Sequence, residues 1–100
     1  MESKMKGIMI IYAPALEDNV LAALAAVGAA KYTKFPLLHG VGGHSEPHLD
    51  TQVWPGTNEA LLVVTDDATK TKLMAEIAKL KKEFSAEGIK AFVLPVEEEI

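Results

Sequence analysis

The hydrophobic residues of the chain form four short runs that are typical of β-strands. Segments 5–12 and 59–65 are almost continuously apolar, which is the pattern of strands covered on at least one face. Segment 31–38 alternates and is rich in aromatic and β-branched residues, and Pro36 within it indicates an edge strand or a bulge. Segment 89–96 is apolar again. The pattern therefore predicts four strands.

Two further stretches place apolar residues at helical spacing. The first follows Pro14, which suits the start of a helix, and ends at Gly28, a residue type that commonly terminates helices. For the second predicted helix, Asp66 supplies an N-cap and Asp67 a first-turn charge, and the helix ends at residues 85–88. The apolar positions of the two helices are Leu16, Val20, Leu21, Leu24 and Val27, and Leu73, Ile77, Leu80 and Phe84.

The order of these elements is strand, helix, strand, strand, helix, strand. This order predicts an α+β fold of the ferredoxin-like βαββαβ type, in which a four-stranded antiparallel sheet carries both helices on one face. One hundred residues are expected to make a single domain, residues 1–100. The second sheet face would be bare in a monomer, so we expect another copy of the chain to cover it.

A loop at about residues 39–58 interrupts this regular pattern. The stretch 32–58 contains all three histidines, the only tryptophan, three of the five prolines and four of the seven glycines. A loop this long in a small domain is uncommon and is usually functional or disordered. We therefore expect the loop to carry the function and the strands and helices to act as its scaffold.

The composition excludes several classes of protein. The chain has no cysteine, so disulfides, thiolate metal sites and cysteine nucleophiles are absent. All ten basic residues are lysine and the net charge is −4, which argues against nucleic-acid binding and against holding a triphosphate. The apolar run 8–12 is too short to span a membrane, and we expect a cytoplasmic protein.

The sequence offers little support for catalysis. It contains no nucleophile elbow, no Ser-His-Asp context and no identifiable pair of buried carboxylates, so we expect a protein that is not an enzyme. A small oxygenase with a loop histidine as its base is the alternative within the same fold.

Three segments resemble the PII signal-transduction family. Residues 90–97 (KAFVLPVE) resemble the K-x-F-V-x-P-V-E segment of its last core strand. Residues 64–67 (VTDD) resemble its strand exit into the second helix, and residues 43–46 (GHSE) resemble the G-H-T-E piece of its effector loop, the T-loop. The resemblance implies a homotrimer that binds a small effector, usually an adenine nucleotide, in clefts between subunits. It also implies that the loop acts on a partner, which is a membrane transporter or an enzyme.

The family's phosphate-binding loop, T-G-x-x-G-D-G-K, is incomplete in this chain. Residues 84–90 (FSAEGIK) match it only at Gly88 and Lys90, and Glu87 adds a negative charge. The family's phosphate-binding arginines have no counterpart, and the loop glutamine that helps to organise Mg-ATP and 2-oxoglutarate is missing. The resemblance therefore implies a diverged member with a short T-loop and weak or altered nucleotide binding.

The predicted effector site combines loop residues with this incomplete motif. The three loop glycines could present backbone N–H groups to an anion, but the lack of basic partners favours a hinge that lets the loop move. The predicted effector-binding residues are Gly40, Gly42, Gly43, His44, Gly88 and Lys90.

A second hypothesis is a metal site in the loop. His39, His44 and His48 are spaced H-x4-H-x3-H, and imidazole is a common ligand of zinc, copper and nickel. A protein with such a site would be similar in architecture to the CutA divalent-cation-tolerance family. The alternative is that the histidines are solvated loop side chains. The bound group is thus expected to be an adenine nucleotide or a divalent transition metal.

Overall fold

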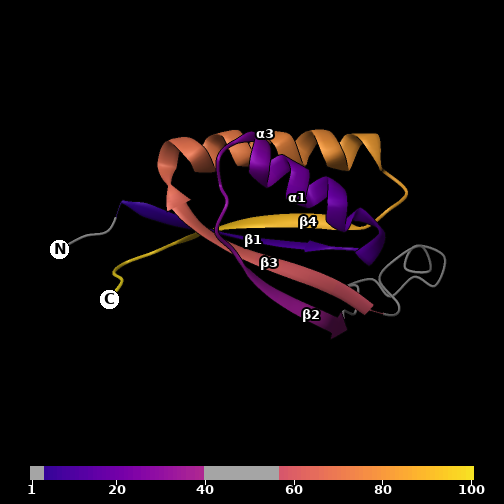
Figure 1. Ribbon diagram of the computed structural model, residues 1–100, viewed down its shortest axis with the longest axis horizontal. Coiled ribbons are helices and arrows are strands. Elements are labelled where there is room, and N and C mark those ends of the chain that lie inside the picture. The colour runs from indigo at the N-terminus through magenta and orange to yellow at the C-terminus, as the bar shows by residue number, and fades with distance from the viewer. Residues whose placement is uncertain (1–3, 40–56) are drawn as a thin grey trace.

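The structure, a computed structural model, describes residues 4–39 and 57–100 of the chain. Within them a four-stranded antiparallel sheet has the strand order β2-β3-β1-β4, and both α-helices lie on one of its faces (Figure 1). This arrangement confirms the predicted ferredoxin-like fold. The elements are β1 (Met5–Tyr12), the 3-10 helix η1 (Pro14–Leu16), α1 (Glu17–Ala26), β2 (Thr33–His39), β3 (Thr57–Asp66), α3 (Asp67–Glu83) and β4 (Ile89–Pro95).

One face of the sheet forms the core with the helices. Alternate residues of β1, namely Ile8, Ile10 and Tyr12, are fully buried, and Ile10 pairs with Leu61 of β3 and with Ala91 of β4. The predicted helix stripes supply the other side of this core, where Val20, Leu24, Leu73 and Ile77 are buried. Each such side chain contributes about 1.5–3 kcal/mol through its burial.

The helix ends follow from their sequence. The Asp66 carboxylate accepts a hydrogen bond of 2.7 Å from the Thr69 amide, which confirms the predicted N-cap and holds the pKa of Asp66 below its usual value. After α1, Gly28 has a φ of 77°, a conformation that costs glycine little, so the chain turns back at the predicted position. The first helix begins with a 3-10 turn at Pro14 before α-helical geometry starts at Glu17.

The strand β2 forms the edge of the sheet and contains the predicted irregularity. Its register against β3 shifts between Phe35 and Leu38, so Pro36 lies within a bulge. The pairing then resumes and reaches His39 opposite Thr57. The β2–β3 ladder therefore includes residues 39, 57 and 58, at the two edges of the predicted loop.

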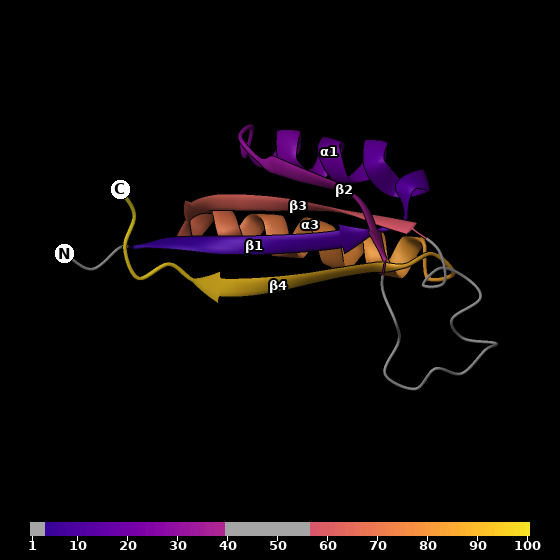
Figure 2. The same ribbon diagram turned by 90° about the horizontal axis from the view of Figure 1, so that it is seen from below.

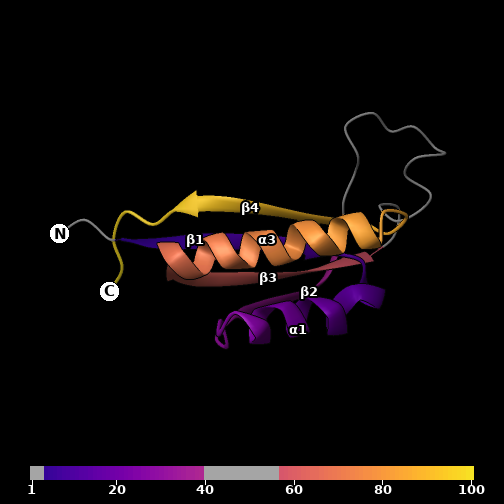
Figure 3. The same cartoon turned by 90° about the horizontal axis from the view of Figure 1, so that it is seen from above.

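Neither of the described α-helices lies over the other face of the sheet (Figure 2). Seen from the opposite side, α1 and α3 lie next to each other across the sheet (Figure 3). Val64 of β3 and Leu94 of β4 flank Gly7 of β1 on this uncovered face and are 44% and 45% exposed. The residues that we call the open face are Met9, Ile11, Phe35, Leu62, Val64, Phe92 and Leu94.

An apolar surface of this kind is a protein–protein contact more often than a solvated face, because single domains rarely expose continuous apolar patches.

In the described part of the chain, neither α-helix has the length and apolarity needed to cross a membrane.

Candidate functional site

A groove between α3 and the edge strand β4 contains Lys90, one of the two predicted effector-binding residues that the structure describes. It has a volume of about 260 Å³, and Lys90 is one of its walls. Gly88 directly precedes β4 and is buried. The residues that line the groove are Met74, Ile77, Ala78 and Lys81 from α3, and Ile89, Lys90, Ala91 and Phe92 from β4.

The groove exists because small residues face each other across it. Ile77 and Ile89 are buried and hold α3 against the sheet, whereas Ala78 and Ala91 are too small to fill the space beside them. Among the described lining residues none is acidic, and two are lysines. The result is an apolar hollow with a positive rim, which suits a ligand that combines a flat or apolar part with a negative charge.

Lys81 is fixed in the wall of this groove. Its ammonium group donates a hydrogen bond of 3.0 Å to the main-chain carbonyl of Ile89, at the beginning of β4. This contact ties the last part of α3 to the edge strand. It also places a positive charge next to the start of β4, the strand that carries the exposed residue Lys90.

Gly88 contributes through its main chain. Its carbonyl accepts a hydrogen bond of 3.0 Å from the Ala13 amide, so the connection between α3 and β4 is joined to the connection between β1 and η1. Glu87, the residue before it, is exposed, and its amide donates to the Phe84 carbonyl at 2.9 Å. The Glu87 carboxylate therefore stands in solvent close to the start of β4.

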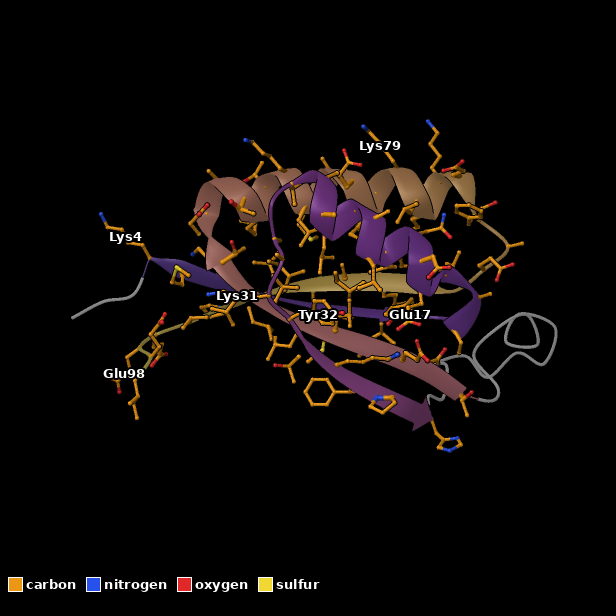
Figure 4. All side chains as sticks on the ribbon, viewed as in Figure 1. Lys4, Glu17, Lys31, Tyr32, Lys79 and Glu98 are labelled. Atoms are coloured by element: carbon orange, nitrogen blue, oxygen red, sulfur yellow. The ribbon has the colours of Figure 1, made fainter. Side chains whose placement is uncertain are left out.

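A second cluster of charged groups joins the two strands that lead to residues 40–56. Lys34 of β2 is hydrogen-bonded to the Glu17 carboxylate at the start of α1, and its ammonium group lies 3.7 Å from the Glu59 carboxylate of β3. The bond to Glu17 raises the pKa of Lys34. Figure 4 shows Glu17 between α1 and the sheet. This ion-pair network fixes β2, β3 and α1 relative to one another.

Tyr12 lies beneath this network. The residue is fully buried, and its hydroxyl has no hydrogen-bond partner among the described residues. Burial, followed by the negative charges of Glu59 and Glu17, raises the pKa of Tyr12 well above its usual value. The sequence alone did not predict this cluster, although the alternation of residues 31–38 places Lys34 on the helix side of the sheet.

Two other hollows are lined by described residues. One, of about 190 Å³, lies between the turn after α1 and the end of β3, where its walls include Lys31 and Val64. The other, of about 810 Å³, is open and lies where the start of β1 meets the end of β4, with Lys6, Asp67 and Glu97 among its walls. The α3–β4 groove differs from both because it is predominantly apolar and contains a predicted effector residue.

Most of the predicted loop residues lie outside the described part of the chain. They are Gly40, Gly42, Gly43, His44 and His48. His39 is described and exposed, and it pairs with Thr57 at the end of β2. Within residues 4–39 and 57–100, no three His, Cys, Asp or Glu side chains are grouped so that they could hold a metal ion.

Comparisons with known proteins support the first of the two hypotheses. The family model described as nitrogen regulatory protein P-II matches residues 5–100. A search of curated protein sequences found no match. The family match therefore favours a PII-like protein over a divalent-cation-tolerance protein.

Solved structures share the fold at low sequence identity. CPII from Thiomonas intermedia K12, a nitrogen regulatory PII-like protein bound to ADP, AMP and bicarbonate, superposes with a TM-score of 0.74 at 18% identity, over 96% of this chain and 93% of that chain. A DUF3240 family protein from Shewanella baltica OS155 gives 0.71 at 11% identity, over 97% and 94%.

A protein from Thermus thermophilus, described as PII-like, gives a TM-score of 0.68 at 20% identity, over 92% of this chain and 85% of that chain. These structures support the fold alone, whereas the family model covers almost the entire sequence. The chain therefore belongs to the nitrogen regulatory protein P-II family.

Proposed function

We propose that this protein is a homotrimeric regulatory protein that binds a small anionic effector at a subunit boundary and thereby changes how it meets a partner. The observation that carries the proposal is the P-II family match over residues 5–100, combined with an uncovered apolar sheet face. The protein acts by binding and not by catalysis. Residues 1–100 work as one domain, with the segment between β2 and β3 as the part that contacts the partner.

The open face supports the trimer. Leu94 and Val64 each leave nearly half of their surface exposed, and Phe92 leaves 49% exposed. Burial of such a half-exposed side chain in an interface contributes about 1 kcal/mol. Several of them together offset much of the cost of association, and three copies that turn their open faces toward a common axis bury all of them.

The α3–β4 groove is the proposed effector site, with Lys90 in its wall and Gly88 directly before β4. The Lys81 and Lys90 ammonium groups meet the negative charge of the effector, and the apolar walls hold its flat part. With no arginine in the chain and the Glu87 carboxylate nearby, a triphosphate is poorly matched. We therefore propose a ligand with few negative charges, such as a nucleoside monophosphate or diphosphate or a small carboxylate. The neighbouring subunit closes the groove.

The partner is proposed to be a transporter or an enzyme, reached by the segment that β2 and β3 carry. Both strands are tied to α1 by Lys34, so a shift of β2 is transmitted to β3 and to the start of α1. The loop residues Gly40, Gly42, Gly43 and His44 complete the proposed effector site. Effector binding then alters the surface that the loop presents.

Titration calorimetry with AMP, ADP, ATP and bicarbonate tests the proposal. We expect one site per chain for AMP or ADP, and no gain in affinity from the third phosphate of ATP. Lys90→Gln removes a charged contact in the groove and should weaken binding about tenfold or more. Lys72→Gln, at an exposed position of α3 that does not line the groove, is the matched control and should bind normally. Absence of binding by all four ligands, or equal affinities of the two variants, would contradict the proposed site.

A further inference from the structure

The segment that follows β4 has a composition that matches the α3–β4 groove. Glu97, Glu98 and Glu99 are consecutive and exposed, and Ile100 after them is an apolar side chain that is fully exposed. We call residues 97–100 the acidic segment. The groove offers the complement, because its described walls are apolar apart from Lys81 and Lys90. The helix above it carries five lysines against three acidic residues.

The acidic segment cannot use the groove of its own chain along its present path. Val96 and Glu97 line the same open hollow as Lys4, Met5 and Lys6, at the start of β1. Figure 4 shows Glu98 at the same end of the molecule as Lys4. Three residues beyond Glu97 span about 10 Å at most, whereas Lys90 is five residues back along β4, or about 16 Å from the end of that strand. The partner that fits the groove is therefore the same segment of a second copy.

We propose that the acidic segment of one copy docks in the α3–β4 groove of a neighbouring copy. Ile100 fills the apolar part of the groove, whose volume of about 260 Å³ is ample for one side chain of this size. The carboxylates pair with Lys81 and Lys90. The segment thereby takes the place of the effector's negative charge and must leave the groove before an effector can bind.

This contact joins two different surfaces, the segment of one copy and the groove of the next. Such a contact generates a ring when the rotation between copies closes, a ring of three included, whereas two copies that exchange their segments would form a two-fold dimer. It therefore agrees with a trimer and rests on the proposed function for both the trimer and the effector site. What it adds is competition between the protein's own carboxylates and the effector.

The absence of cysteine from the chain permits a direct test by disulfide cross-linking. The double variant Ile100→Cys with Ala78→Cys places one thiol in the acidic segment and one in the groove wall. A disulfide forms only when the two Cα atoms come within about 7 Å. Mild oxidation should give covalent dimers and trimers on a denaturing gel. The double variant Ile100→Cys with Ala22→Cys, an exposed position on α1, is the matched control and should remain largely monomeric.

A second measurement tests the charges. Changing Glu97, Glu98 and Glu99 together to glutamine keeps the shape of the segment and removes its charge. We expect cross-linking to fall about fivefold and the affinity for ADP to rise by a similar factor, the effect of losing two exposed ion pairs of ordinary strength. Unchanged values for both would overturn the competition.

The outcomes separate this inference from the proposed function. Light scattering on the same samples gives the oligomeric state. A trimer that does not cross-link, or that forms only a disulfide within one chain, would overturn the docking and leave the proposed trimer standing. A monomer would overturn both.

Discussion

The buried hydroxyl of Tyr12 allows a prediction that depends on one atom. Tyr12→Phe removes that oxygen and leaves the ring in the core, where the residue is fully buried. The oxygen has no hydrogen-bond partner among the described residues, and a buried polar group in that state costs about 1–3 kcal/mol. We therefore expect the variant to be more stable than the unmodified chain by about 1 kcal/mol, which corresponds to a rise in Tm of roughly 4–8 °C for a chain of this length.

The assay is thermal and urea unfolding followed by circular dichroism at neutral pH. Tyr32→Phe is the control, because Tyr32 is 45% exposed and the loss of its hydroxyl should change the free energy of unfolding by less than about 0.5 kcal/mol. A clear decrease in the stability of Tyr12→Phe would show that the buried hydroxyl does not destabilise the folded chain. It would mean that the hydroxyl donates a hydrogen bond in solution, with the Glu59 carboxylate, which raises the pKa of Tyr12, as the candidate acceptor.

The same variant makes a prediction about alkaline pH. The pKa of Tyr12 in the folded chain is raised above its unfolded value of about 10. The folded state therefore binds the tyrosine proton more tightly than the unfolded state. The resulting contribution to the free energy of unfolding is fully present below pH 10 and is lost as the pH rises toward the pKa of the folded state. Relative to Tyr12→Phe, the unmodified chain should lose about 1.4 kcal/mol per pH unit above pH 10. Parallel curves for the two proteins between pH 9 and 11 would contradict this.

Three further predictions follow from other parts of the structure. Leu73→Ala should lower the free energy of unfolding in urea by about 2–5 kcal/mol, because Leu73 is fully buried between α3 and the sheet, and a loss below 1 kcal/mol would mean that this core is loose. Leu94→Glu should dissociate the proposed trimer into folded monomers in light scattering. Val93→Glu, on the neighbouring residue of the same strand but the opposite sheet face, should not; equal masses would show that the open face is not the interface. Asp66→Ala should lower Tm at neutral pH by removing the α3 N-cap. Because the pKa of Asp66 is depressed, the difference in Tm between the variant and the unmodified chain should vanish as the pH falls through that pKa. A difference in Tm that persists at pH 2 would have another cause.

Local sequence signals predicted the elements well where they determine the backbone directly. Pro36 cannot donate a ladder hydrogen bond, and the strand has its bulge there. Gly28 takes the positive φ that ends the first helical region, and Asp66 caps the second α-helix. These features depend on residues no more than three or four positions away, so the local sequence is sufficient to predict them.

The features that the sequence did not predict depend on contacts between distant segments. The strands β2 and β3 extend to His39 and Thr57 because each supplies the other's hydrogen bonds, which no local propensity reveals. The α3–β4 groove arises because Ala78 and Ala91, thirteen residues apart in sequence, face each other. The link from Lys34 to Glu17 joins a strand to a helix across the fold. For the candidate site, the sequence placed Lys90 at the start of the last strand but could not show that Lys81 stands beside it.

In the proposed trimer, two further copies of the same chain cover the open face. Sedimentation equilibrium of the unmodified protein, at several concentrations without added ligand, tests this most directly. We expect a single species with three times the 10.8 kDa mass of the chain. A stable species at 10.8 kDa across the concentration range would contradict it, because the open face would then be solvated and no subunit boundary would exist at which to bind an effector.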